Sequence, residues 1–391
     1  MRYSNLTLTL ITVGTMFVLG GCGTKTNSVT DSNGIAHINL ANSHELESSI
    51  DVKELGNSVK YVPLEYKDKC ALSNIIKVRP TRSSFFIMTP QGLYRFGRDG
   101  KYKTTIGKKG NGPGEYNLFV DFCVDENQQM VYGLDMLVKK IRKYRYDGSY
   151  VEDYPLSPFC FQLFKLSKDR FAVQPIDYNG DRECKMVVIN TNGDTLKKFA
   201  NSVLFTRVGS PIMINHQYSY KFYNNQVQFN QIFNDTIFNI NRDIDLQPLY
   251  IMDCGKQKMP LKILTDGMKL IDEGGKYYLV RKYLETDHQL FIDYNYNKQL
   301  HHVVYSKDDG SVRHLGRRDS LGIKNTLDHG LPFWPETIYN DNEMIGMWTA
   351  VKLRAYLDHM KSLKQEIPDA LKTIDKTLTM NDNPVLQIVT L

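Results

Sequence analysis

The chain contains 391 residues, with 49 Lys and Arg residues against 43 Asp and Glu residues, for a formal net charge of +6. This excess is small compared with the concentrated basic charge of nucleic-acid-binding proteins, so no nucleic-acid partner is expected. The length is sufficient for one large or two ordinary domains.

The N-terminus predicts export. Arg2 is followed by an apolar segment, Leu6 to Leu19, that is shorter than the ~20 helical residues needed to span a bilayer but suits the core of a signal peptide. The segment ends in Leu-Gly-Gly-Cys, which resembles the lipobox of bacterial lipoproteins, where the bond before the cysteine is cut and the cysteine carries lipid. We therefore predict a signal peptide over residues 1–21 and lipidation of Cys22, with an ordinary secretory signal as the alternative.

The lipid on Cys22 would anchor the protein to a membrane. Gly23-Thr24 lacks the aspartate that often retains lipoproteins in the inner membrane, so we expect an outer-membrane lipoprotein that faces the periplasm or the cell surface. The polar residues from Thr24 to Asn33 cannot bury a core, so residues 22–50 are predicted to be the lipidated N-terminus and a flexible tether. Residues 51–391 then form the folded domain.

Five cysteines remain after Cys22, namely Cys70, Cys123, Cys160, Cys184 and Cys254. They lie scattered inside apolar runs, which favours buried thiols over a disulfide framework. A single disulfide between Cys160 and Cys184 stays open as the alternative.

Hairpin turns recur along the domain. Four segments place an apolar strand before and after an Asp-Gly or Asn-Gly turn, which is the strongest short hairpin signal because glycine supplies the positive φ of the turn. The turn glycines are Gly100, Gly148, Gly193 and Gly310. The first two gaps are 48 and 45 residues, and a degenerate copy places Asp243 fifty residues beyond Gly193; the remaining 67 residues to Gly310 imply an insertion. A spacing of about 45–50 residues with four strands per unit is typical of a β-propeller blade. We predict five blades over residues 74–107, 120–156, 159–200, 218–253 and 268–317, with longer links at 201–217 and 254–267.

The segment Thr104 to Tyr116 reads TTIGKKGNGPGEY, and its glycines raise the possibility of a phosphate-binding loop. Such a loop opens a helix, whose N-terminal N–H groups hold the anion. Here the following residues, which include Phe119, Val120 and Phe122, predict a strand, and no Gly-Lys-Ser/Thr triplet is present. We therefore interpret the segment as a structural connection from the outer strand of one blade to the inner strand of the next. Its loop residues are Gly107, Gly110, Gly112, Pro113, Gly114 and Glu115.

The C-terminal part departs from the repeat. Apolar residues at helical spacing from Val351 to Leu363, and a second set after Pro368, predict a helical insertion over about 350–380. We expect the insertion to pack on the last blade, with a partner-binding helix as the alternative.

The sixth blade is one strand short in this frame. Only PETIYN, EMIGMWT and VLQIVTL predict strands after residue 326, whereas Ser58 to Tyr66 (SVKYVPLEY) is a strand-like run without a blade of its own. An open ring would leave unpaired strand edges at its seam. We therefore predict an all-β, six-bladed β-propeller in which the N-terminal strand supplies the outer strand of the sixth blade.

The segment IGKKGNGPGEY after an Asp-Gly hairpin, together with VKYVPLEY before it and the final NPVLQIVTL, resembles the six-bladed propeller lipoproteins of unknown function of Gram-negative bacteria, relatives of the NHL-repeat propellers. The resemblance covers essentially the whole mature chain. It implies the fold and supplies no catalytic residues.

Catalytic signatures are absent from the sequence. His301 and His302 are neighbours on a predicted strand, so their side chains point to opposite faces, and we expect one to be packed and the other solvated. Asp121 and Asp125 would lie about 13 Å apart along a strand, beyond the ~5–9.5 Å of paired glycosidase carboxylates. A basic, aromatic run over residues 139–146 could meet an acidic ligand, but we interpret it as a solvated strand edge.

Two classes of function follow. The first is a non-enzymatic lipoprotein that binds a glycan, a peptide or a partner protein through its loop face or central channel. The second is an enzyme resembling NHL-type lyases or lactone hydrolases, with a divalent metal held at the channel by residues from several blades. Because no local catalytic signature is present, we favour the first and predict no cofactor.

Overall fold

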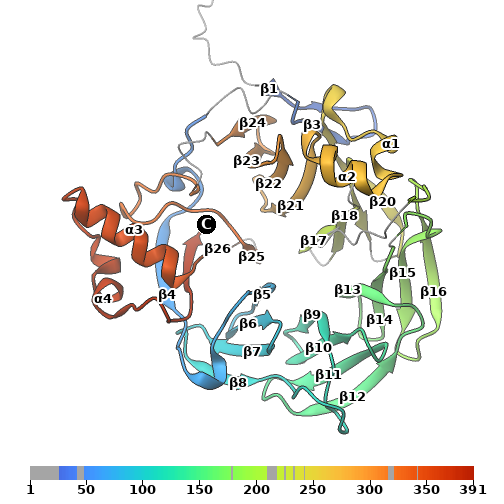
Figure 1. Cartoon of the computed structure of the whole chain (residues 1–391), viewed down its shortest axis with the longest axis horizontal. Coiled ribbons are helices and arrows are strands. Elements are labelled where there is room, and N and C mark those ends of the chain that lie inside the picture. The colour runs from blue at the N-terminus through green and yellow to red at the C-terminus, as the bar shows by residue number, and fades with distance from the viewer. Residues whose placement is uncertain are drawn as a thin grey trace, which may run out of the picture.

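The computed structural model describes residues 26–41, 48–177, 179–208, 218–223, 226–231, 234–241, 243–315, 321–340 and 342–391. Six sheets are arranged around a central axis and form a six-bladed propeller (Figure 1). The predicted signal peptide over residues 1–21 and the lipidation site Cys22 lie outside the described residues, so both stay predictions. In the described part of the chain, no helix is both long and apolar enough to cross a membrane.

Blades one to three are four-stranded antiparallel sheets whose strands follow the chain from the centre to the rim. Blade one contains β5 (Lys77–Pro80), β6 (Ser84–Thr89), β7 (Gly92–Gly97) and β8 (Tyr102–Thr105). Blade two contains β9 (Phe119–Asp125), β10 (Met130–Asp135), β11 (Lys140–Arg145) and β12 (Tyr150–Pro155). Blade three contains β13 (Cys160–Lys165), β14 (Arg170–Pro175), β15 (Cys184–Asn190) and β16 (Thr195–Ala200).

Blades four and five carry extra strands at the rim, supplied by the N-terminal segment. Blade four contains β17 (Tyr218–Tyr223), β18 (Gln226–Gln231), β19 (Thr236–Ile240) and β20 (Leu246–Asp253), followed by β3 (Ala36–Asn39) and β2 (Val29–Thr30). Blade five contains β21 (Leu279–Glu285), β22 (Gln289–Tyr296), β23 (Gln299–Ser306) and β24 (Ser311–His314), followed by β1 (Thr26–Asn27).

The strands β1, β2 and β3, which lie in the segment predicted to be a flexible tether, are therefore part of the propeller. Strand β3 pairs in parallel with β20, and Ile38 and Leu40 are fully buried in the core between blades four and five. The prediction of a tether over residues 22–50 is wrong for this stretch, because the outer edge of blade four accepts one more strand.

The sixth blade closes the ring as predicted. Its order from the centre is β25 (Thr337–Tyr339), β26 (Glu343–Trp348), β27 (Val385–Thr390) and β4 (Ser58–Pro63). The blue β4 lies beside the red C-terminal elements in Figure 1 and pairs antiparallel with β27 along its whole length.

Within the described ranges, four α-helices lie outside the sheets. The predicted insertion forms α3 (Ala350–Ser362), which the Thr349 side chain caps at Lys352 N, and α4 (Asp369–Thr377). Leu353, Leu357 and Leu371 of these helices pack with Tyr61 and Val385 of blade six, so the insertion covers the last blade. The helices α1 (Leu261–Leu264) and α2 (Gly267–Glu273) were not predicted, and blade five begins at Leu279 instead of Met268. Short 3-10 helices span Val52–Glu54, Asp68–Cys70, Gly255–Gln257 and Gly274–Lys276.

The core lies mainly between neighbouring blades. Phe86 and Met88 of blade one, for example, pack with Phe122 and Tyr144 of blade two. Each blade therefore buries its faces against two neighbours. The predicted hairpin turns are confirmed, because the four turn glycines all have positive φ: Gly100, Gly148, Gly193 and Gly310. The five described cysteines are free thiols, so the alternative of a Cys160–Cys184 disulfide is wrong.

Candidate functional site

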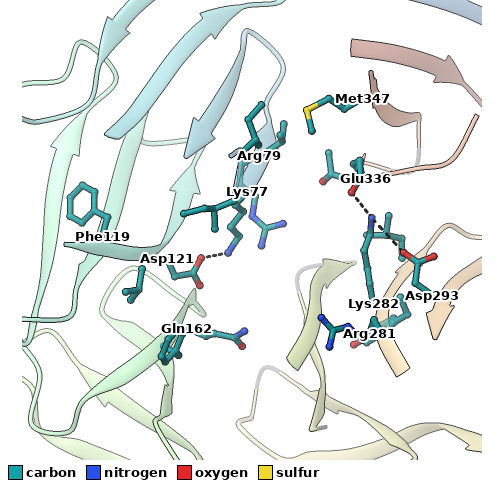
Figure 2. Close-up of a pocket in the computed structure, with 18 of the residues that line it drawn as sticks. Lys77, Arg79, Phe119, Asp121, Gln162, Arg281, Lys282, Asp293, Glu336 and Met347 are labelled. Carbon is teal, nitrogen blue, oxygen red and sulfur yellow. Dashed lines mark hydrogen bonds and ion pairs between the residues drawn. The ribbon is translucent and has the colours of Figure 1, made fainter. Parts of the chain in front are cut away.

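A cavity of about 840 Å³ lies in the centre of the ring. Its lining includes residues at or near the beginning of the inner strands β5, β9, β13, β21 and β25, so it lies at the end of the ring where these strands start. The volume is within the 300–1,000 Å³ typical of sites for small ligands. Figure 2 shows its charged side chains on two walls that face each other.

Bulges in the inner strands shape the cavity. The pairing register shifts by one residue at Val120 in β9, at Phe161 in β13 and at Arg281 in β21. A bulge lets two successive side chains face the same side of a strand, which the ordinary alternation forbids. Arg281 and its neighbour Lys282 consequently both line the cavity.

The first wall is organised by Asp121 of β9, which is 2% exposed. Its carboxylate forms an ion pair with Lys77 Nζ of β5. The same carboxylate accepts hydrogen bonds from the backbone N–H groups of Phe122 (2.8 Å) and Leu163 (2.9 Å). Asp121 therefore joins the inner strands of three blades.

The charged form of Lys77 is disfavoured by burial. Burial, reinforced by the positive charge of Arg79, lowers the pKa of Lys77 to about 8 although Asp121 opposes the shift. Lys77 and Arg79 lie two residues apart on β5, so both side chains project from the same face of the strand and line the cavity.

The second wall contains a chain of charged groups from blades five and six. Lys282 Nζ lies 2.7 Å from Glu336 Oε2, donates to Pro335 O at 3.0 Å and lies 4.0 Å from Asp293 Oδ2. Asp293 Oδ1 in turn lies 2.7 Å from His302 Nδ1. The His302 ring lies against Trp334, with 4.4 Å between the ring centroids.

Two arginines in the lining differ from these paired groups. In the described ranges, Arg79 and Arg281 form no ion pair and no side-chain hydrogen bond, and both are half-buried. Figure 2 shows both guanidinium groups directed into the space between the walls. The half-buried rings of Phe161 and Trp334 add flat apolar surface to a lining that also contains many aliphatic side chains.

The glycine loop lies away from this cavity, in the connection from β8 to β9. Its own Glu115 accepts a hydrogen bond from Gly112 N (2.9 Å) and pairs with Lys108 Nζ (3.0 Å), and these two contacts lower the pKa of Glu115. An internal carboxylate therefore pairs with one N–H group and one lysine of the loop, in the place that a bound phosphate would take. Tyr144 of blade two donates to Gly114 O at 2.9 Å, which fastens the loop to the next blade.

The other residues considered from the sequence have structural partners. His302 lines the cavity, whereas His301 points to the opposite face, stacks on Tyr294 and lies 3.1 Å from His314. Both histidines are half-buried, so the expectation of one solvated histidine is wrong. Asp125 pairs with Lys165, 3.0 Å away, and not with Asp121.

The basic run over residues 139–146 is not a solvated edge. Its strand β11 is the third strand of blade two, between β10 and β12. Carboxylates on those neighbouring strands pair with its cations; the pairs are Lys140–Asp153, Arg142–Asp135, Arg142–Asp153 and Lys143–Glu152.

Sequence reasoning missed Lys77, Arg79, Arg281 and Lys282. The available signal was weak: cations at the start of predicted inner strands, where apolar residues are the norm. Among the described residues, no group of three or more His, Cys, Asp or Glu side chains could hold a metal ion.

The chain is similar to one protein family and to several solved structures. A family model described as a domain of unknown function (DUF4934) matches residues 35–390. The structure is similar to that of a candidate exported protein of Bacteroides fragilis NCTC 9343, with 19% identity and a TM-score of 0.71, covering 90% of this chain and 98% of that chain. A member of the DUF4221 family from Bacteroides vulgatus ATCC 8482 matches at 10% identity and a TM-score of 0.48, covering 67% of this chain and 84% of that chain. No curated protein matches. The first likeness shows the fold and nothing about a ligand.

Proposed function

We propose that this chain, which belongs to the DUF4934 family of unknown function, is an exported, lipid-anchored propeller that binds a glycan in its central cavity. The cavity carries the proposal: it combines a ligand-sized volume, polar groups from several blades and the half-buried rings of Phe161 and Trp334. Aromatic rings offer flat apolar surface to the C–H faces of a sugar, while the charged groups can orient its hydroxyls.

A cavity-filling variant tests this proposal. Gln162 lines the cavity, and Figure 2 shows its side chain pointing into it. Gln162→Trp should reduce binding at least tenfold on a glycan microarray, because the larger side chain occupies the ligand volume. Gln128→Trp, at an exposed turn outside the cavity, is the matched control and should bind as the wild type does.

Two results would contradict the proposal. Equal binding by Gln162→Trp and wild type would place the glycan elsewhere on the surface. A wild-type protein that binds no glycan on the array would remove glycans as the ligand class.

The anchoring part of the proposal depends on Cys22. Cys22→Ser should abolish incorporation of radiolabelled palmitate and leave the protein in the aqueous phase of a detergent partition. Ser28→Cys in the same background is the control, since it restores a thiol outside the lipobox and should not restore labelling. Unchanged detergent-phase partitioning of Cys22→Ser would refute lipid anchoring.

A second candidate function is proton-transfer chemistry at the same cavity. Asp293 holds His302 Nδ1 at 2.7 Å, and in the described structure the other ring nitrogen has no hydrogen-bond partner. This arrangement orients an imidazole as a general base. If it acts so, a bound glycan should be cleaved with a rate that His302→Gln abolishes without loss of binding, whereas an intact glycan after prolonged incubation would exclude it.

A further inference from the structure

We infer that the cavity ligand carries an oxyanion group, a carboxylate, sulfate or phosphate, which binds between Arg79 and Arg281. The inference rests on the proposed function and specifies the chemistry of the ligand for the same site. It follows from how the charges of the lining are paired.

Each acidic side chain of the lining already has a donor. Asp121 is held by Lys77 and two backbone N–H groups, and Asp293 by His302. Glu336 is held by Lys282. Asp177 accepts a hydrogen bond from Gly180 N at 2.7 Å. The lining contains four lysine and arginine side chains and four carboxylates, but the local pairs leave the two arginines without a carboxylate.

Unpaired guanidinium groups are costly in such a place. Partial burial removes water from the charge, and the usual compensation is a carboxylate or another oxyanion. Arginine presents a planar fork of donors that matches two oxygens of one oxyanion, so it recognises such groups with high geometric specificity.

The backbone presents both arginines to the cavity. Arg281 is the bulged residue of β21, so the bulge turns it to the cavity side together with Lys282. Arg79 shares a strand face with Lys77, whose pKa it helps to lower. The two cations Lys77 and Arg79 therefore share this wall with one carboxylate, that of Asp121, before any ligand binds. An oxyanion between the walls would relieve the repulsion between Arg79 and Lys77 and pair with Arg281 on the other side.

Isothermal titration calorimetry with four probes tests the inference. The probes are trigalacturonate as the carboxylate, a sulfated chondroitin disaccharide, glucose 6-phosphate, and maltotriose as the neutral control. At least one anionic probe should bind, and the probe that binds most tightly identifies the oxyanion. Its affinity should fall as salt is raised, because ionic strength screens the attraction.

Variants assign the binding to the two arginines. Arg79→Gln and Arg281→Gln should each weaken the anionic probe at least tenfold, and the Lys variants at these positions should retain part of the affinity because they keep the charge and lose the fork. Arg145→Gln, at an exposed position of β11 outside the cavity, should have no effect. Circular dichroism checks that each variant is folded.

The outcomes separate this inference from the proposed function. Maltotriose binding that Gln162→Trp abolishes and the arginine variants leave unchanged would overturn the oxyanion inference and keep the glycan cavity. An equal loss of anion binding in Arg145→Gln would show nonspecific attraction and would also overturn it. Failure of all three anionic probes would overturn the oxyanion inference alone if a glycan on the array still binds, whereas the proposed function fails only if no glycan on the array binds.

Discussion

Leu386 in the last strand of the chain lies directly opposite Val62 in β4, and both side chains are buried in the core between blades six and one. The pair joins a strand from the N-terminal part of the chain to the last strand of the chain within one sheet. Closure of this kind leaves no unpaired strand edge at the seam of the ring, which is why a propeller benefits from a blade built from both parts of the chain.

Removal of Val385–Leu391 should therefore unfold the whole domain. The deletion separates β4 from β26 and exposes faces that blade one and blade six bury against each other, so the loss spreads from blade to blade. We expect no cooperative thermal transition in near-ultraviolet circular dichroism. A chain that begins at Ser28, and so lacks only the short β1, is the control and should keep the transition. Cooperative unfolding of the truncated chain at the wild-type temperature would contradict the closure argument.

The N-terminal strand β3 should contribute to stability. Ile38 is fully buried, whereas Val29 of the adjoining β2 is 69% exposed. Ile38→Ala should lower the free energy of unfolding by about 2–5 kcal/mol, the usual cost of a large-to-small change in a core. Val29→Ala should change it by less than about 0.5 kcal/mol. Urea denaturation measures both, and equal values for the two variants would mean that β3 is not part of the folded core.

The glycine loop should tolerate no side chain at two positions. Gly107 and Gly114 have φ of +65° and +75°, and a Cβ atom at either would lie 2.7 Å from a tyrosine ring of blade two. Gly107→Val and Gly114→Val should each cost about 1–3 kcal/mol of stability, because both strain and a clash result. Gly112→Ala should cost less, since the nearest atom would lie 3.1 Å away at the flexible Glu115 side chain.

The same loop should not respond to nucleotides. We expect ATP and NAD to leave the melting temperature of the wild type unchanged, because Glu115 already pairs with Gly112 N and Lys108 Nζ of the loop. A saturable increase in melting temperature that Gly114→Val abolishes would revive the phosphate-loop interpretation.

Lys77 should make stability increase with pH. Burial first, and Arg79 second, lower the pKa of Lys77 in the folded protein from its ordinary value of 10.5 to about 8. Between these values the unfolded chain binds more protons than the folded chain, so the free energy of unfolding rises with pH; below pH 8 both states are protonated and the full penalty applies. The free energy of unfolding of the wild type, minus that of Lys77→Met, should rise from pH 8 to pH 10 by at most about 3 kcal/mol.

Lys143 provides the control for this titration. Burial opposes, but the contacts with Glu152 and Tyr154 outweigh it, so the pKa of Lys143 is raised. Its contribution is present below its ordinary pKa and is lost as pH rises through the raised value. The free energy of unfolding of the wild type, minus that of Lys143→Met, should therefore not rise between pH 8 and pH 10. Parallel curves for the two lysines in urea denaturation would contradict the assignment for Lys77.

Much of the fold could be predicted from local signals in the sequence. The Asp-Gly and Asn-Gly turns positioned four hairpins because only glycine adopts their positive φ at low cost, and helical spacing located α3 and α4 within the sixth blade. Strand counting also predicted that β4 closes the ring, since an unpaired edge is unfavourable wherever it lies.

Pairing partners were the first thing that only the tertiary structure decided. The polar segment before residue 40 carries no periodic signal strong enough to predict a strand, and β3 forms because β20 offers an edge beside a buried pocket for Ile38. The basic strand β11 was predicted to be a solvated edge because the carboxylates that neutralise it lie on neighbouring strands. The sequence does not show the register that brings these carboxylates beside the cations.

The lining of the candidate site was the second feature that only the tertiary structure decided. Arg79 and Arg281 are distant along the chain and line the same cavity only because the blades close into a ring. The bulge that turns Arg281 inward depends on how β21 pairs with β22, which is a property of the sheet and not of the local sequence. The sequence by itself thus determined the repeating hairpins, whose turns obey local backbone rules, whereas the ring alone decided which side chains surround the ligand cavity, because that lining takes residues from several separate blades.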